Sequence, residues 1–322
     1  MTASPADNPA RSPARSRRPL LDRSHCATPV ASPSSSRYCH RNMTAGHVGS
    51  GHEGERVTRA AVERVVAALS QRDREILADV TRVRVLTGRQ IERLHFANLA
   101  GTHRDRKRRR VLARLVSLRL LAVLKRRIGG VRAGSAGLVF ALGVVGQRLL
   151  ALEANRSPAV HDGRSRHPGT PTERFLKHSL AGSELYVQLV EQARAGSLSL
   201  VGFRAEPACW WRDGEGKWIK PDAYVVVSDG DIEDSWAIEV DMATESLPTL
   251  RRKLVGYLDL VERGEKGPDE EVLPRVLVSV PDKQRCRAVR QLVRGLPPPA
   301  DELFVVTLHD LVVAKLGEVL RE

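Results

Sequence analysis

Residues 220–241 read KPDAYVVVSDGDIEDSWAIEVD, and they hold two apolar, β-branched runs on either side of an Asp-Gly turn. This pattern predicts two neighbouring strands. Asp222 belongs to the first run, whereas Glu239 and Asp241 close the second. Because residues two apart on a strand point to the same face of a sheet, Glu239 and Asp241 should project together, with Asp222 beside them on the neighbouring strand.

Three carboxylates on one face repel one another unless a proton or a divalent cation lies between them. Oxygen ligands of this kind suit Mg²⁺ or Mn²⁺, and metal-dependent phosphodiester cleavage is commonly built on such clusters. We therefore predict that Asp222, Glu239 and Asp241 are catalytic residues and metal ligands, with Lys253 stabilising charge on the phosphate. The alternative is that they are solvated strand-end carboxylates, or ion-pair partners of the basic run at 251–253.

The segments around this stretch complete a domain over residues 172–322 that is α+β or α/β in class. We predict a helix over 172–195, strands at 198–210, 217–228 and 235–242, a helix over 247–263, a strand over 272–280, a helix over 282–294, a strand over 303–307 and a last helix from 309. This αβββαβ order predicts a central sheet that is flanked by helices.

A second pattern occupies residues 56–154. Apolar spacing predicts a first helix that includes Val62 and Leu69, Ser70 caps a second helix, and Thr87 with Gln90 forms a capping box that opens a third. A further helix is expected over 102–118, and two strand-like runs with a Gly-rich tip follow it before a helix that ends near residue 153. Helices followed by a β-hairpin are typical of a winged helix-turn-helix domain.

The charge is unevenly divided between these two parts. The whole chain carries +14, but residues 56–156 hold 21 Arg and 2 Lys against 7 acidic residues, while residues 157–322 hold 22 basic against 27 acidic residues. A basic block joined to a mildly acidic one indicates a polyanion-binding module that is attached to a part with another task.

Most of this positive charge lies on one predicted helix and on the hairpin after it. Cations at a helix N-terminus oppose its macrodipole, so a phosphate partner would explain their presence there. The alternative is a solvated Arg-rich face. The predicted contacts to double-stranded DNA are Arg104, Arg106, Lys107, Arg108, Arg109 and Arg110 on the helix, and Arg126, Arg127 and Arg132 on the hairpin.

The remaining segments set the context. Residues 1–55 are rich in Ser, Pro, Ala and Arg and lack periodicity, so we expect a disordered leader, for which Met43 offers an alternative start; residues 155–171 are expected to be a linker. No apolar run approaches the ~20 residues that span a bilayer, so a soluble protein is expected. Four scattered cysteines without CxxC spacing fit a reducing cytosol.

Other candidates have mainly structural interpretations. Trp210 and Trp211 alternate along a predicted strand, so one is expected in the core and the other is able to stack on a base. His178 is expected to make a satisfied polar contact, and Cys209 and Cys286 are expected to be small buried hydrophobes.

The order of helix, PD-bearing strand and ExD-bearing strand resembles the PD-(D/E)xK nuclease superfamily. That resemblance implies that Asp222 and Glu239 hold Mg²⁺, and that a lysine two residues after the Glu helps to position the attacking water. Position 241 is Asp in this chain, so Lys253 on the next helix is the candidate for the missing ammonium, as in members with a migrated lysine. Glu184 on the first helix is a candidate for a further acidic contact.

The two parts together resemble the replication-relaxation family of bacterial proteins, which is associated with plasmids and integrated conjugative elements. The matching stretches are LTGRQI at 86–91, RRRVLARL at 108–115, KPDA at 220–223, EVDMATE at 239–245, and Lys253 with Tyr257. The resemblance covers about residues 70–295, and it implies a role in the replication or DNA relaxation of mobile elements. Besides double-stranded DNA, the candidate partners are other replication or conjugation proteins and a second copy of the chain.

Three functions fit these features. The first is a DNA-processing protein whose winged helix docks duplex DNA while a nuclease-like domain nicks it with one Mg²⁺. The second is a non-catalytic replication initiator or regulator with a degenerate nuclease-like domain. The third is a transcription factor with an acidic dimerisation domain, which leaves the carboxylate grouping unexplained.

Overall fold

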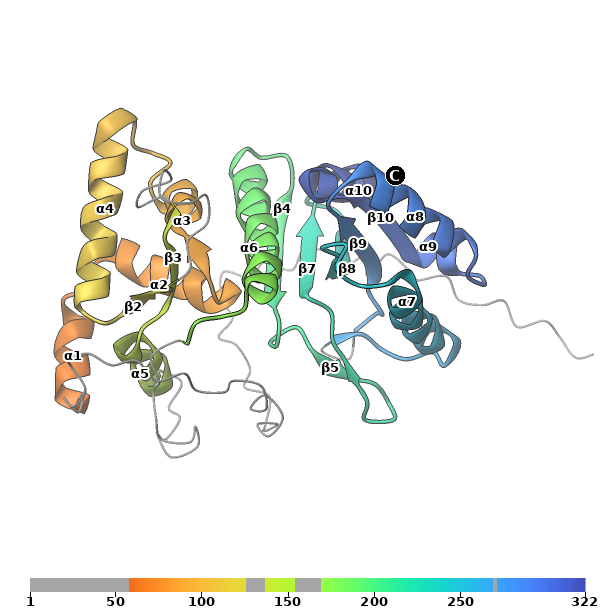
Figure 1. Ribbon diagram of the computed structural model, residues 1–322, viewed down its shortest axis with the longest axis horizontal. Coiled ribbons are helices and arrows are strands. Elements are labelled where there is room, and N and C mark those ends of the chain that lie inside the picture. The colour runs from red at the N-terminus through yellow and green to blue at the C-terminus, as the bar shows by residue number, and fades with distance from the viewer. Residues whose placement is uncertain (1–57, 126–136, 154–168, 269–270, 322) are drawn as a thin grey trace, which may run out of the picture.

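The computed structural model describes residues 58–125, 137–153, 169–268 and 271–321, and it shows a mixed α and β architecture (Figure 1). The predicted leader, most of the predicted linker, and Arg126, Arg127 and Arg132 lie outside the described residues. None of the described helices is long and apolar enough to cross a membrane.

The N-terminal elements follow the predicted order, with one short strand added. They are α1 (Arg59–Ala67), α2 (Gln71–Val83), β1 (Leu86–Thr87), α3 (Gly88–His95), α4 (Gly101–Ser117), β2 (Leu121–Val123), β3 (Val139–Leu142) and α5 (Val144–Glu153). The three strands form one antiparallel sheet in the order β1-β3-β2.

Both predicted helix starts in this part are confirmed. The Ser70 hydroxyl accepts a hydrogen bond from the Asp73 amide, and the Asp73 carboxylate accepts one from the Ser70 amide at 2.9 Å. Thr87 and Gln90 form the same reciprocal arrangement at the start of α3. Such capping boxes satisfy backbone donors that have no partner within the helix. Asp73 also accepts from Arg114 at 2.5 Å, which ties the start of α2 to α4.

The C-terminal elements are α6 (Glu173–Arg194), β4 (Ser199–Ala205), β5 (Trp211–Arg212), β6 (Trp218–Ile219), β7 (Ala223–Ser228), β8 (Glu233–Val240), α7 (Leu247–Glu262), β9 (Arg275–Val280), α8 (Lys283–Arg294), α9 (Ala300–Leu303), β10 (Phe304–Leu308) and α10 (Val312–Arg321). Five strands form a mixed sheet in the order β10-β9-β8-β7-β4. The strands β4, β7 and β8 pair antiparallel, whereas β8, β9 and β10 pair parallel.

Three predicted strands end earlier than expected or divide. The run at 198–210 ends at Ala205, shortly before Pro207, and the run at 217–228 splits into β6 and β7 on either side of Pro221. Proline has no backbone N–H to donate to a ladder, so it interrupts pairing at both places. β8 ends at Val240, which leaves Asp241 just beyond the strand.

The side chains of β8 are buried on both faces of the sheet. Trp236, Ile238 and Val240 belong to a hydrophobic cluster with α6 and α10, whereas Ala237 belongs to a second cluster with α7 and α8. The alternation of side chains along a strand therefore directs Glu239 to the layer formed by α7 and α8. Figure 1 shows α6 and α7 on opposite sides of the sheet.

One buried cluster joins the N-terminal elements to the sheet. It runs from Ile76 on α2 and Leu115 on α4 to Leu185 on α6 and Ile238 on β8. Cys209 and Cys286 are also buried and free, as predicted.

Candidate functional site

The site is built on the pairing of β7 with β8. Ala223 pairs with Ile238, so Asp222 lies opposite Glu239 at the end of the ladder. The Asp222 amide donates to the Ile238 carbonyl at 2.9 Å, and the Asp222 Oδ2 accepts from the Val240 amide at 2.7 Å. The two carboxylates are thereby held side by side on adjacent strands.

Helix α7 supplies the partners of Glu239. It begins at Leu247 behind the Ser246 cap, with a proline in its first turn. Residues four apart on a helix lie on the same side, so Lys253 and Tyr257 both reach Glu239. The Tyr257 hydroxyl donates a hydrogen bond to the Glu239 Oε1 at 2.7 Å, and the Lys253 ammonium donates one to the Glu239 Oε2.

Glu239 is 2% exposed, and this burial dominates its chemistry. Complete burial raises the pKa of Glu239 to about 7; the Lys253 ammonium opposes this increase, and the Asp222 carboxylate adds to it. Burial also disfavours the charge on Lys253, but Glu239 and Asp222 together raise the pKa of its ammonium. Lys253 therefore stays protonated between the two carboxylates.

Asp222 has a second partner, His178 on α6, which sequence reasoning did not assign to the site. The His178 Nε2 lies 3.1 Å from the Asp222 Oδ1. Burial alone would raise the pKa of the Asp222 carboxyl, but His178 and Lys253 hold that pKa below its usual range. The same hydrogen bond raises the pKa of His178. No signal in the sequence links the two, because 44 positions separate them.

Asp241 lies just beyond the end of β8, and its carboxylate has partners other than those of Asp222 and Glu239. Its Oδ2 accepts from the Arg285 Nε on α8 at 2.6 Å, and its Oδ1 accepts from the Ala243 amide at 2.8 Å. Among the described residues, no group of three or more His, Cys, Asp and Glu side chains is arranged to hold a metal ion. The structure thus brings together Asp222, Glu239 and Lys253, and it leaves Asp241 in a separate ion pair.

Glu184 also lies away from these residues. Its carboxylate accepts from Arg93 at 2.5 Å and from the Gln90 side chain at 3.0 Å, both on α3. The residue therefore joins α6 to the N-terminal elements instead of entering the site, because it faces α3 from the middle of α6.

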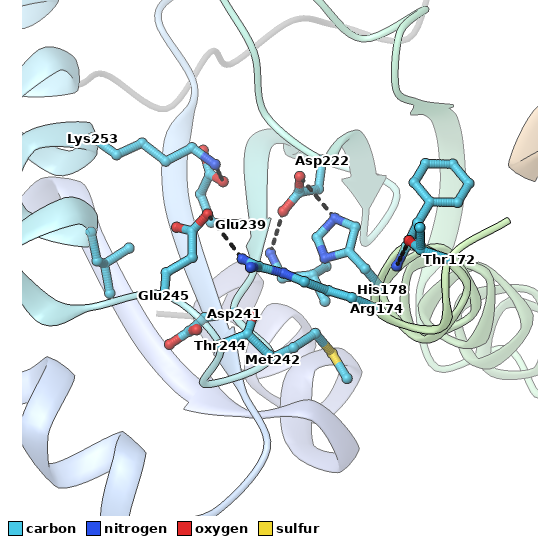
Figure 2. A pocket seen from close by; sticks show the side chains of 13 residues that line it. Thr172, Arg174, His178, Asp222, Glu239, Asp241, Met242, Thr244, Glu245 and Lys253 are labelled. Carbon is cyan, nitrogen blue, oxygen red and sulfur yellow. Dashed lines mark hydrogen bonds and ion pairs between the residues drawn. The ribbon is translucent and has the colours of Figure 1, made fainter. Parts of the chain in front are cut away.

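A cavity of about 320 Å³ opens between α6, the strand ends and α7. Asp222, Glu239, Asp241 and Lys253 line it together with Arg174, and Figure 2 shows His178 against Asp222 at its edge. Glu245, in the loop before α7, lies 3.9 Å from the Arg174 guanidinium. The wall thus places cations beside carboxylates, with polar groups facing the cavity.

The basic residues of α4 form a second feature on the N-terminal part. Arg106, Lys107, Arg109 and Arg110 are exposed. Arg104 is half-buried, and its Nε donates to the Leu99 carbonyl at 2.6 Å. These five residues leave a run of positive charge along the first half of the helix.

Arg108 differs from its neighbours, and the prediction that it contacts DNA requires correction. Its side chain is 2% exposed, its Nε lies 3.0 Å from Glu92, and it also pairs with Asp105. Residues three and four positions away on α4, Val111 and Leu112, lie on the same buried stripe. Arg108 is therefore a structural residue between α3 and α4.

The comparisons with known proteins agree with one of the resemblances. A family model described as replication-relaxation matches residues 77–276, from α2 to the start of β9. The match therefore includes both the basic helix and the cavity. None of the curated proteins matches the chain, and none of the solved structures does.

We predict a raised pKa for His178 in buffer that contains EDTA, and a fall in that pKa in Asp222→Asn. Because the folded-state pKa lies above the ordinary value of 6.5, the pair contributes fully to stability below about pH 6.5 and loses that contribution as the pH rises through the folded-state pKa. An NMR titration of the imidazole protons measures the pKa of His178, and the signal that is missing in His178→Gln identifies this residue. An identical titration curve in Asp222→Asn would contradict the assignment.

The two neighbouring arginines of α4 should behave differently when truncated. Arg108→Ala removes a buried side chain from between α3 and α4 together with its ion pairs to the partly exposed Glu92 and Asp105, so we expect it to lower the free energy of unfolding by about 2 kcal/mol. Arg109 is 57% exposed and pairs with Asp105 at 2.8 Å, so Arg109→Ala should cost less than about 1 kcal/mol. Urea denaturation measures both values, and equal losses would show that Arg108 is not a buried structural residue.

Proposed function

Because the chain belongs to the replication-relaxation family, we propose that it binds duplex DNA of a mobile genetic element and nicks one strand during replication or relaxation. The basic helix α4 docks the DNA, and the cavity at Asp222 acts on the phosphodiester. Convergence of Asp222, Glu239 and Lys253 on one cavity is the observation that carries the proposal.

The element order supports a winged helix in the N-terminal part. A short strand β1 separates α2 from α3, the connection from α3 to α4 spans residues 96–100, and β2 and β3 follow α4 as an antiparallel pair. In such domains the second helix of the helix-turn-helix lies in the major groove. The exposed cations of α4 are then suited to contact the phosphates on either side of the groove.

The element order also supports a nuclease-like C-terminal domain. The sequence α6, β4, β7, β8, α7, β9 gives a mixed sheet with helices on both faces. Asp222 directly precedes β7, Glu239 lies near the end of β8, and Lys253 lies on the helix that follows. This placement agrees with the PD-(D/E)xK pattern in which the lysine has moved to the next helix.

The donor set fits one hard divalent cation, held by Asp222 and Glu239, and it does not extend to Asp241. The Asp222 carboxylate contributes to the raised pKa of Glu239, and a cation between the two carboxylates would relieve that repulsion. When bound, Mg²⁺ or Mn²⁺ supplies neutralising charge and an activated water. The chain contributes the remaining functions through side chains already in place.

Those functions follow from the contacts. Lys253, which stays protonated, donates to a phosphate oxygen and stabilises its negative charge. His178 orients the Asp222 carboxylate through the 3.1 Å contact. Arg174 at the edge of the cavity binds a neighbouring backbone phosphate, because its guanidinium is largely exposed and its ion pair with Glu245 is long at 3.9 Å.

A second candidate is a non-catalytic DNA-binding initiator or regulator. It is favoured by the fact that both oxygens of Asp222 and both oxygens of Glu239 already accept hydrogen bonds from protein donors. A site that is neutralised by its own ammonium and imidazole is stable without an added ion. The domain would then contribute contacts to DNA or to partner proteins.

A plasmid assay separates these two candidates. With Mg²⁺ or Mn²⁺, the wild-type protein should convert supercoiled plasmid to the open circle, and Asp222→Asn and Glu239→Gln should lower the rate about 100-fold or more. Glu245→Gln removes a carboxylate from the same cavity that has no proposed role, so it should stay within a few-fold of wild type. Intact plasmid with the wild-type protein, or equal cutting by all variants, would leave the non-catalytic candidate.

The role of α4 is tested by binding to duplex DNA at several salt concentrations. Lys107→Gln and Arg110→Gln should each weaken binding and reduce the slope of log K against log salt by about 0.9, because each removes one phosphate contact. Arg287→Gln removes an exposed cation from α8 and serves as the matched control. Fluorescence anisotropy gives the slopes, and unchanged slopes for the α4 variants would contradict a phosphate-binding role.

A further inference from the structure

The hairpin formed by β5 and β6 has one buried and one outward face. Trp211 pairs with Ile219, and Arg212 pairs with Trp218. Trp211 is 8% exposed, and both it and Ile219 pack in the cluster with α7 and α8. Because side chains alternate along a strand, Arg212 and Trp218 project from the opposite face. Sequence reasoning placed one tryptophan of the Trp210–Trp211 pair in the core, and Trp211 is that residue.

The outward face carries two tryptophan–cation pairs. The Arg212 guanidinium lies 4.4 Å from the centre of the Trp218 ring, and the Lys220 ammonium lies 4.9 Å from the centre of the Trp210 ring. We call Trp210, Arg212, Trp218 and Lys220 the tryptophan–cation strip. Within the described part of the chain, Arg212 and Lys220 form no ion pair with a carboxylate, so their charge is available to an external anion.

The turn of this hairpin is fixed to the rest of the domain. The buried Asp213 accepts from the Glu215 amide at 3.1 Å and from the Lys217 amide at 2.7 Å, and it pairs with Arg263 beyond the end of α7 at 3.1 Å. The Gly214 amide donates to Glu265 at 2.8 Å. These contacts hold a hairpin whose strands are only two residues long in a fixed position. A fixed position lowers the entropy cost of binding to the hairpin.

The strip leads directly to the cavity. Lys220 is separated from Asp222 by Pro221 alone in the sequence. The Cys209 thiol donates a hydrogen bond to the Pro221 carbonyl at 3.1 Å. Figure 1 shows the hairpin projecting from the body of the domain. A strand that lies along the outward face of the hairpin therefore arrives at the carboxylate end of β7.

We propose that the tryptophan–cation strip binds unpaired nucleotides of a DNA strand and guides that strand to the Asp222 cavity; this inference rests on the proposed action of the cavity on DNA. Tryptophan rings and the guanidinium plane stack on any base, and the two cations neutralise phosphates. A duplex hides its base faces, so the strip favours single strands. The substrate class of the site is then a locally opened strand, delivered after α4 has docked the flanking duplex.

The test measures binding in EDTA, where no cleavage takes place, so that it does not depend on the activity of the site. The full chain is titrated with a single-stranded oligonucleotide of mixed sequence and with the matching duplex. We expect Trp218→Leu and Arg212→Gln to weaken single-strand binding about tenfold, with duplex binding changed less than twofold. Trp218→Phe keeps a ring and should retain most of the affinity. Arg294→Gln, an exposed arginine on α8, controls for the loss of charge alone.

Tryptophan fluorescence gives a second measurement that does not require a variant to fold as wild type. Trp211 and Trp236 are buried, so quenching by the single strand reports Trp210 and Trp218. Quenching by the single strand but not by the duplex supports the proposal. Equal losses of single-strand and duplex affinity, loss in Arg294→Gln matching that in Arg212→Gln, or absence of quenching would overturn it. Normal strip binding with no nicking would instead count against the proposed function alone.

Discussion

The register between β7 and β8 is the constraint on which the site depends. Pairing of Ala223 with Ile238 sets Asp222 opposite Glu239 and directs Glu239 to the layer of α7. A slip of one residue in the pairing would turn the Glu239 carboxylate toward α6 and α10, where the surrounding side chains form an apolar cluster. A buried carboxylate without a donor is costly, so the contacts from Lys253 and Tyr257 also favour the native register. The chemistry of the site and the pairing of the sheet therefore stabilise each other.

Helix α6 connects this site to the N-terminal part of the chain, which carries the basic helix α4. Its first turns place His178 against Asp222, and its later turns carry Glu184 and Glu191, which both pair with Arg93 on α3. These partly exposed ion pairs contribute less than the apolar cluster that runs beneath them, from α2 through α6 to β8. Because the link is a packed core and not a flexible segment, DNA bound at α4 would have a defined orientation relative to the cavity.

Local chemistry made much of the fold predictable, whereas long-range partners were not. Ser70 and Thr87 each have a reciprocal partner three residues later, so the sequence was sufficient to locate the starts of α2 and α3. Periodicity could not distinguish Arg108 from the cations around it, since its burial depends on Glu92 of another helix. The face of Asp241 followed from alternation, but its ion pair with α8 required tertiary structure. His178 makes the polar contact that was expected of it, but its partner Asp222 could not be predicted for the same reason.

The charges around the cavity bear on whether the acidic C-terminal part of the chain would accept a polyanion as proposed. Residues 157–322 carry more acidic than basic groups, yet every carboxylate at the cavity has a cationic neighbour. The pairs are Asp222 with His178, Glu239 with Lys253, Asp241 with Arg285, and Glu245 with Arg174. Paired charges cancel at distances beyond a few ångströms, so an approaching phosphate meets little net repulsion. Exposed Arg212 and Lys220 on the neighbouring hairpin then add attraction. The electrostatic cost of bringing a DNA backbone to the buried carboxylates, as the proposed function requires, would thus be offset by cations that belong to the fold itself.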